Sequence, residues 1–300
     1  MSVRMAPFAA LVIALAAAGC ATPAATDAPG VSPSPSMSSG SPAAAPDVIA
    51  HPTGTDEIVL RFDEAGGFVP AEFFAAHVPY FTLYGDGTVV FVSTAAITEP
   101  AQNGPSTGQP IRTTRLGEPR IQELLAFALT DGGLAIARER YDNPQVADAP
   151  TAVFEIHAAD DSKTVSVMAL GMDARPDADS AVKAALARLG ERLRDFDPGA
   201  SLGSAPYIPP AYRGVLTEAG GVQGVNVRGW PWPSLTPADF RPPADPNVIQ
   251  QRIRVLTPDE AAAIGVQGYQ NGIQGGLWYR GPDDVPYSFV LRPLLPDETG

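Results

Sequence analysis

Two short stretches place a serine in a pattern that hydrolases use for nucleophilic catalysis. Residues 104–108 read Gly-Pro-Ser-Thr-Gly, the G-x-S-x-G pattern of a nucleophile elbow, and Ser180 with Lys183 gives the S-x-x-K pattern. The first stretch is flanked by polar residues and not by a strand and a helix, and the second lacks the S-D-N sequence that accompanies S-x-x-K. We therefore expect a polar loop at 104–108, a first-turn helix residue at Ser180 and a solvated helix residue at Lys183.

The three histidines are dispersed along the chain. His51 follows a Pro-rich stretch, His77 falls in an expected loop, and His157 shares one face of an expected strand with Glu155. A zinc site needs three or four converging ligands. We expect neither a metal site nor a bound cofactor.

Carboxylates could carry out hydrolysis without a short sequence pattern, because glycoside cleavage needs only two acids across a cleft. Glu139, Asp142 and Asp148 lie in one loop and are the candidates for such a site. Asn-Pro and Asp also serve turns well, so a structural role is the simpler interpretation. A cell-surface hydrolase with a carboxylate-based site is kept as the alternative function.

Four aromatic residues near the C-terminal end form the best candidate for a ligand or partner surface. They are Trp230, Trp232, Trp278 and Tyr279. Aromatic rings with few charges nearby can hold a sugar ring or an apolar side chain of a partner. In a region with few aliphatic residues the same rings can form the core, and the sequence favours the core over the surface.

Residues 1–19 have the layout of a secretory signal, with Arg4 followed by an apolar stretch at 7–18 that is too short for a stable membrane span. The stretch ends in Ala-Ala-Gly-Cys at 17–20, which resembles the bacterial lipobox, although the family usually has Leu where Ala17 stands. The resemblance implies cleavage before Cys20 and fatty acyl groups on that residue. It implies a lipoprotein at the extracytoplasmic face of a membrane. Ala21 after the cysteine fits export to an outer membrane if the organism has one.

Composition agrees with a lipid anchor. Cys20 is the single cysteine among 300 residues, so no disulfide within the chain can form. The net charge of −13 argues against nucleic-acid binding. It also argues against attachment to anionic lipid head groups through a cluster of basic residues. Residues 20–55 are rich in Ala, Pro and Ser and have no apolar face to bury, which predicts a disordered tether.

Residues 56–199 predict an α+β domain. Ile58, Leu60 and Phe62 alternate as a half-buried strand requires. Further patterns predict, in chain order, a hairpin at 81–92, a helix from Pro119 to a Gly-Gly stop, a hairpin at 152–170 and a helix at 178–195. This order lacks the regular strand-helix alternation of a parallel sheet, so we expect an antiparallel sheet packed by two helices.

The stretches YGDGTVVF (84–91), RIQELLAFALTDGGL (120–134) and YDNPQVADAPTAVFEI (141–156), with the closing helix, resemble domains of unknown function in bacterial exported proteins. The resemblance covers about half of the chain. It implies a fold and a location and no catalytic residues.

Residues 200–300 are Pro- and Gly-rich and predict a smaller, mainly antiparallel β domain with short helices that begin at Thr236 and Thr257. Strands are expected at 225–232, 251–256, 276–280 and 287–291. The sequence as a whole favours a membrane-anchored, non-enzymatic module. We expect it to bind an envelope protein or a glycan.

Overall fold

The computed structural model describes residues 48–69, 71–94, 105–159, 161–172, 176–219, 226–242 and 251–298. The predicted signal peptide, Cys20 and residues 21–47 of the predicted tether lie outside these residues. The prediction of disorder is wrong for residues 48–55, because Ile49 packs against the core of the first sheet and exchanges hydrogen bonds with Gln122. Residues 47–300 belong to one compact unit. No helix in the described part of the chain is long and apolar enough to cross a membrane.

The fold is α+β, as the sequence predicts, with two sheets and short helices between and around their strands. The first sheet has eight strands in the order β6-β8-β7-β1-β2-β3-β5-β9, and all neighbours are antiparallel except the short pair β6 and β8. Its strands are β1 (Ile58–Gly66), β2 (Phe81–Tyr84), β3 (Thr88–Val92), β5 (Ile111–Arg115), β6 (Arg140–Tyr141), β7 (Pro150–Ala158), β8 (Asp161–Met168) and β9 (Ala205–Pro206).

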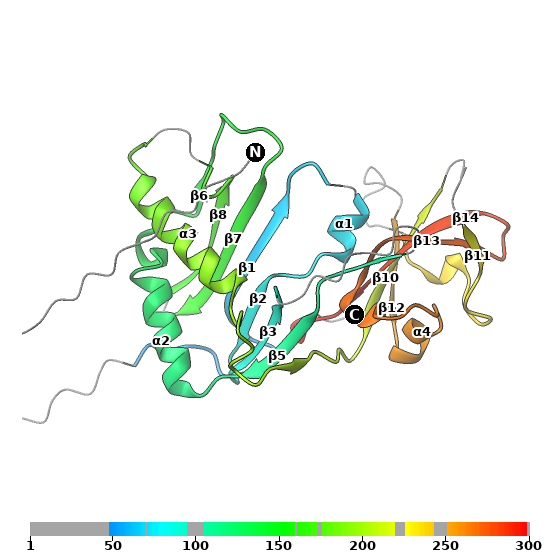
Figure 1. The fold of residues 1–300 in the computed structure, drawn as a ribbon, viewed down its shortest axis with the longest axis horizontal. Coiled ribbons are helices and arrows are strands. Elements are labelled where there is room, and N and C mark those ends of the chain that lie inside the picture. The colour runs from blue at the N-terminus through cyan, green and yellow to red at the C-terminus, as the bar shows by residue number, and fades with distance from the viewer. Residues whose placement is uncertain are drawn as a thin grey trace, which may run out of the picture. The chain divides into compact units, whose positions relative to one another are not determined.

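Two helices cover one face of this sheet, α2 (Glu118–Leu129) and α3 (Ser180–Arg194), which lie together on one side of its strands in Figure 1. Their apolar faces, including Leu125 and Leu189, join the sheet residues in one buried core. Gly190 allows α3 to approach closely, because a Cβ atom at this position would lie 3.2 Å from the Phe62 ring. The apolar spacing that predicted both helices is thus the spacing of their packing contacts.

Strand β1 departs from the predicted alternation at its beginning. Its register with β2 shifts between Ile58 and Leu60, as at a β-bulge. Consequently Val59 joins Leu60 and Phe62 in the core under the helices, whereas Ile58 packs with a separate apolar cluster. The prediction for Leu60 and Phe62 is confirmed, and that for Ile58 is wrong because one extra residue changes the face to which it belongs.

The second sheet has the order β11-β13-β14-β10-β12, with the short strand β4 also paired to β13. It is antiparallel except where β11 runs parallel to β13. Its strands are β4 (Ser106–Thr107), β10 (Tyr212–Glu218), β11 (Val227–Gly229), β12 (Gln251–Leu256), β13 (Ile273–Arg280) and β14 (Pro286–Pro293). The central strand β10 is not predicted by the sequence patterns.

Two short α-helices and three 3-10 turns complete the described fold. The helices are α1 (Ala71–Ala76) and α4 (Pro258–Ala262), and the turns are η1 (Leu134–Ile136), η2 (Pro237–Asp239) and η3 (Tyr269–Asn271). The two helix starts predicted at Thr236 and Thr257 are confirmed. The backbone N–H of Thr236 donates to Asp239, and that of Thr257 donates to Glu260, as in a capping box.

Several segments pass from one sheet to the other. Strand β9 follows the predicted boundary at 199/200 and pairs with β5 of the first sheet, while β4 precedes the boundary and pairs with β13 of the second. Helix α1, between β1 and β2, packs on the second sheet through Ala76, Val215 and Val290. The division into domains at this position stays a prediction.

The C-terminal segment, residues 294–298, lies across the face of the first sheet opposite α2 and α3. Leu295 is buried there with Tyr84. Asp297 accepts hydrogen bonds from the Arg61 guanidinium at 2.7 Å and from the Tyr84 hydroxyl at 2.6 Å. Burial alone would raise the pKa of Asp297, but these two hydrogen bonds hold it below the usual value. The segment therefore joins the end of β14 to the first sheet.

Replacing Asp297 by Ala should destabilise the protein by about 1–3 kcal/mol, because Arg61 and Tyr84 lose a partner inside the fold. Urea unfolding of this variant would measure the loss. Asp142→Ala is the matched control, since its exposed pair with Arg140 should contribute no more than about 0.5 kcal/mol. Equal stabilities for the two variants would contradict the role given to Asp297.

The same contact predicts a pH dependence. Because the folded-state pKa of Asp297 is lowered, its stabilisation is complete above the unfolded value of about 3.9 and is lost as the pH falls through the folded value. The stability difference between the wild type and Asp297→Ala should therefore shrink when unfolding is measured below about pH 4. A difference that stays constant to the lowest pH would contradict an ionised Asp297.

Candidate functional site

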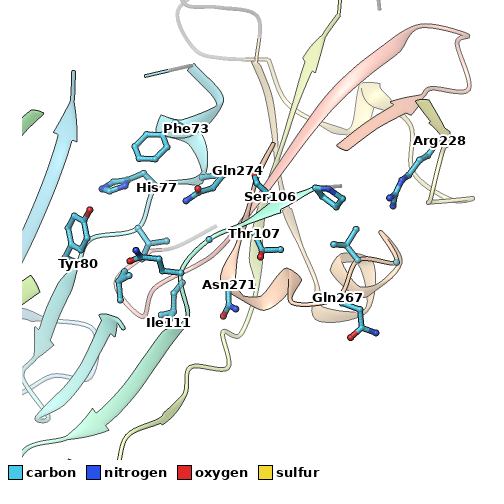
Figure 2. Close-up of a pocket in the computed structure, with 18 residues that line it drawn as sticks. Phe73, His77, Tyr80, Ser106, Thr107, Ile111, Arg228, Gln267, Asn271 and Gln274 are labelled. Atoms are coloured by element: carbon cyan, nitrogen blue, oxygen red, sulfur yellow. The ribbon is translucent and has the colours of Figure 1, made fainter. Parts of the chain in front are cut away.

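A cleft of about 720 Å³ lies where elements of the two sheets meet (Figure 2). Small-molecule sites occupy roughly 300–1,000 Å³, so the cleft has the size of a ligand site. Its lining comes from α1 and the residues after it, from the segment around β4, from β11, and from the turns before β13. The lining residues are Phe73, Ala76, His77, Val78, Tyr80, Val92, Pro105, Ser106, Thr107, Gly108, Gln109, Ile111, Arg228, Gly265, Val266, Gln267, Asn271 and Gln274.

The polar lining consists mainly of neutral groups that can both donate and accept hydrogen bonds. Within the described residues, the following side chains of the cleft form no hydrogen bond with the protein: Ser106, Thr107, Gln109, Gln267, Asn271 and Gln274. No carboxylate is among the described lining residues. The cleft therefore offers hydroxyl and amide groups to a ligand, with Arg228 as its one permanent charge among these residues.

One end of the cleft is aromatic. Figure 2 shows Phe73, His77 and Tyr80 close together there. The Phe73 and His77 ring centroids lie 5.5 Å apart, and His77 Nε2 lies 2.5 Å from Asp63 Oδ1 on β1. Burial raises the pKa of Tyr80, so its hydroxyl stays protonated at neutral pH. Asp63 thus fixes the orientation of the His77 imidazole. Together with the Phe73 ring, this imidazole lines the aromatic end of the cleft.

The floor of the cleft depends on a close backbone approach. The N–H of Gly108 donates to the carbonyl oxygen of Gly272 at 2.7 Å. A Cβ atom at position 108 would lie 2.5 Å from the carbonyl oxygen of Asn271, which real Cβ atoms do not approach so closely. Glycine at this position therefore lets the segment after β4 lie directly against the turn that carries Asn271.

The serine of the 104–108 stretch is not on a nucleophile elbow. Ser106 begins the short strand β4, which pairs with β13, and no helix follows it. In Figure 2, the His77 ring lies on the side of Tyr80 and Phe73, away from Ser106. The structure therefore brings Ser106 into the cleft as one of its hydroxyl groups and not beside a base.

The Ser180 and Lys183 pair belongs to the N-terminal turn of α3. Lys183 is buried and its ammonium donates to Asp177 at 2.8 Å, while the Ser180 hydroxyl donates to the same carboxylate at 3.0 Å. The expectation that Lys183 is solvated is wrong, because only 7% of this residue is exposed and its ammonium group contacts Asp177. Both side chains of the motif thus contact the Asp177 carboxylate at the start of the helix.

A chain of hydrogen bonds runs over the open face of β7 and β8. Glu155 lies 3.0 Å from His157 Nε2, and His157 Nδ1 lies 2.8 Å from the Ser162 hydroxyl, directly across the strand pair. Ser162 is exposed on a sheet surface, and none of the three residues lines the cleft. Because a serine nucleophile also needs donors around the reacting oxygen, this arrangement describes a surface cross-strand network.

The carboxylates considered for hydrolysis are not brought together around the cleft. Glu139, Asp142 and Asp148 are all exposed, and Asp142 pairs with Arg140 at 2.7 Å. Asp148 has a φ of 56°, as expected for a turn residue. None of the three lines the cleft. The geometry therefore gives the hydrolase hypothesis no support.

The four aromatic residues proposed from the sequence fall on different sides of the second sheet. Trp232 and Tyr279 are buried, at 3% and 1% exposure, in the core of that sheet. Trp230 is half-buried against them, and Trp278 lies outside this core. Both indole N–H groups of Trp230 and Trp232 donate to backbone carbonyls inside the fold. Their rings pack edge to face with centroids 5.2 Å apart and leave no common aromatic surface.

Among the cleft residues, the sequence drew attention to His77 and to the stretch 104–108, and the remaining lining residues gave no functional signal. They come from distant segments, and Ser, Thr, Asn and Gln are ordinary loop residues. The close approach at Gly108 is visible only once the two segments are seen together.

Replacing Trp232 by Ala should lower the free energy of unfolding by about 3–5 kcal/mol, because a large buried ring leaves a cavity in the core of the second sheet. Trp278→Ala, which removes a half-buried ring, should cost clearly less. Chemical denaturation of both variants would measure this difference. A Trp232→Ala variant as stable as the wild type would contradict the assignment of this ring to the core.

Comparison with known proteins identifies no relative of this chain, so its function is inferred from the geometry of the cleft. No family model, no curated protein and no solved structure matches the chain. The resemblance to uncharacterised exported domains accordingly stays a prediction.

Proposed function

We propose that the chain is a membrane-anchored, extracytoplasmic lipoprotein whose folded part binds a glycan of the cell envelope in the cleft. The observation that carries the glycan assignment is the set of six neutral side chains that line the cleft and form no hydrogen bond with the described protein. Sugars present many hydroxyl groups that both donate and accept, and such side chains match them.

The aromatic end of the cleft supports the same ligand class. Phe73 and Tyr80 offer apolar ring surface beside the polar groups, and a sugar ring also has apolar C–H faces. A protein partner is a weaker fit, because the central part of a protein interface is usually a buried apolar patch and not a concave polar site.

The membrane location is proposed from the sequence. The signal-like residues 1–19, the single Cys20 and the Pro-rich stretch after it support a lipid anchor followed by a tether. As a flexible chain, residues 21–47 would place the folded part of the protein on the order of 30 Å from the membrane.

Replacing Cys20 by Ala should release the protein from the membrane, because the proposed anchor is the lipid on this thiol. Cells would be labelled with an alkyne analogue of palmitate and fractionated. We expect the wild type to be labelled and membrane-bound and the variant to be neither. A variant that stays in the membrane fraction would contradict lipid anchoring at Cys20.

Replacing Gln274 by Ala should weaken glycan binding roughly 3- to 10-fold, the usual effect of losing one net hydrogen bond. Full-length protein in detergent would be titrated with cellobiose and N,N′-diacetylchitobiose by ligand-observed NMR. Gln145→Ala is the matched control, since Gln145 is exposed and does not line the cleft. The proposal fails if neither the tested sugars nor isolated envelope glycans bind, or if binding is unaffected by Gln274→Ala.

A further inference from the structure

Arg228 stands out in the cleft because no carboxylate of the described residues pairs with its charge. It lies on β11, whose neighbour β13 supplies Tyr279 directly beside it in the sheet register. No acidic group of the described residues forms an ion pair with Arg228, although most other arginines of the fold do have such partners. A partly buried guanidinium that contacts the Tyr279 hydroxyl but no described carboxylate is ready to bind an anion.

The hydroxyl group nearest to Arg228 does not neutralise it. Burial raises the pKa of Tyr279 to about 12, and the neighbouring Arg228 guanidinium only partly opposes this shift. Tyr279 is therefore uncharged at neutral pH, and its hydroxyl donates to the backbone carbonyl of Ile264 at 3.3 Å. The positive charge of Arg228 remains available to the cleft.

The position of Arg228 within the cleft indicates which part of a ligand it would contact. Figure 2 shows Arg228 at the end of the cleft opposite Phe73, His77 and Tyr80, with Gln274, Ser106 and Asn271 between the two ends. A ligand held by the neutral groups in the middle would thus present one terminus to the aromatic rings and the other to the guanidinium.

We propose that the cleft takes a carboxylate-bearing glycan, an acidic sugar whose carboxylate is bound by Arg228. This inference rests on the proposed function and adds the charge of the ligand to it. The planar guanidinium matches a carboxylate with two parallel hydrogen bonds, which a neutral hydroxymethyl group cannot accept in the same way.

The overall charge of the protein limits the ligand further. A net charge of −13 repels densely anionic polymers at long range. A glycan with an isolated carboxylate among neutral sugars suffers less from this repulsion and still gains the contact with Arg228. The predicted class is therefore a neutral glycan that carries sparse uronic or similarly carboxylated sugars.

The test compares cellobiose with cellobiuronic acid, which differ only in the oxidation of one C6 hydroxymethyl group to a carboxylate. Affinities of both would be measured by calorimetry with the full-length protein in detergent. For the wild type we expect cellobiuronic acid to bind roughly 10- to 100-fold more tightly, as for a charge-assisted hydrogen bond. For Arg228→Gln this preference should disappear.

Two further variants test whether the preference for the acidic sugar depends on the guanidinium of Arg228 in particular. Arg228→Lys keeps the charge but not the planar pair of donors and should retain part of the preference. Arg280→Gln is the matched control, because Arg280 lies one residue further along the same strand pair and is exposed outside the cleft. It should leave both affinities unchanged. Near-ultraviolet circular dichroism would show that each variant keeps its fold.

The remaining outcomes separate the two proposals. Equal binding of the two sugars to the wild type, or a preference that survives in Arg228→Gln, would overturn the role of Arg228 and leave glycan binding intact. Binding of neither sugar would overturn the acidic-sugar proposal, whereas the proposed function fails only if N,N′-diacetylchitobiose and isolated envelope glycans do not bind either. The dipeptide N-acetyl-Ala-Ala serves as a third probe, and Arg228-dependent binding of it alone would reassign the cleft to a peptide carboxylate.

Discussion

The connection between the two sheets is the constraint on which the rest of this structure depends. The hydrogen bonds from Arg61 and Tyr84 to Asp297 hold the C-terminal segment on the first sheet, and that segment continues directly from β14 of the second. The pairing of β4 with β13 and of β9 with β5 crosses the same boundary in both chain directions. The cleft is lined from both sides of this boundary, so its shape depends on these contacts.

The chemistry of the cleft follows from what the two sides contribute. Helix α1 and the residues after it supply rings, with His77 oriented by Asp63, whereas β4 and the turns of the second sheet supply hydroxyl and amide groups. The cleft thus places aromatic rings at one end beside neutral donors and acceptors that a ligand can reach.

The sequence predicted those elements whose pattern is local. The hairpin at 81–92 has alternating strands around a Gly-containing turn, and α2 and α3 have apolar residues at helical spacing, so each carries its own signal. Strand β10 was missed because Gly214 interrupts an apolar stretch that is buried on both faces, and α1 was missed because six residues are too few for a helical period. Register shifts such as the one at Ile58 come from pairing with another strand and leave no local pattern.

The candidate site could not be predicted in the same way. The sequence drew attention to Trp232 and Tyr279 because large aromatic residues are conspicuous, and burial places both in the core. The cleft combines Phe73, Ser106, Arg228 and Gln274, which are far apart in the chain and individually unremarkable. Only the crossing of segments between the sheets brings them together, and this depends on long-range contacts.

Photoaffinity labelling would show directly whether the cleft is the binding site. A diazirine derivative of cellobiuronic acid would be irradiated with the full-length protein, and the labelled peptides would be identified by mass spectrometry. We expect labels confined to residues 73–80, 105–109 and 265–274 and to the segment around Arg228, all suppressed by excess unlabelled sugar. Suppressible labels on another surface, such as the open face of β7 and β8 around His157, would contradict it.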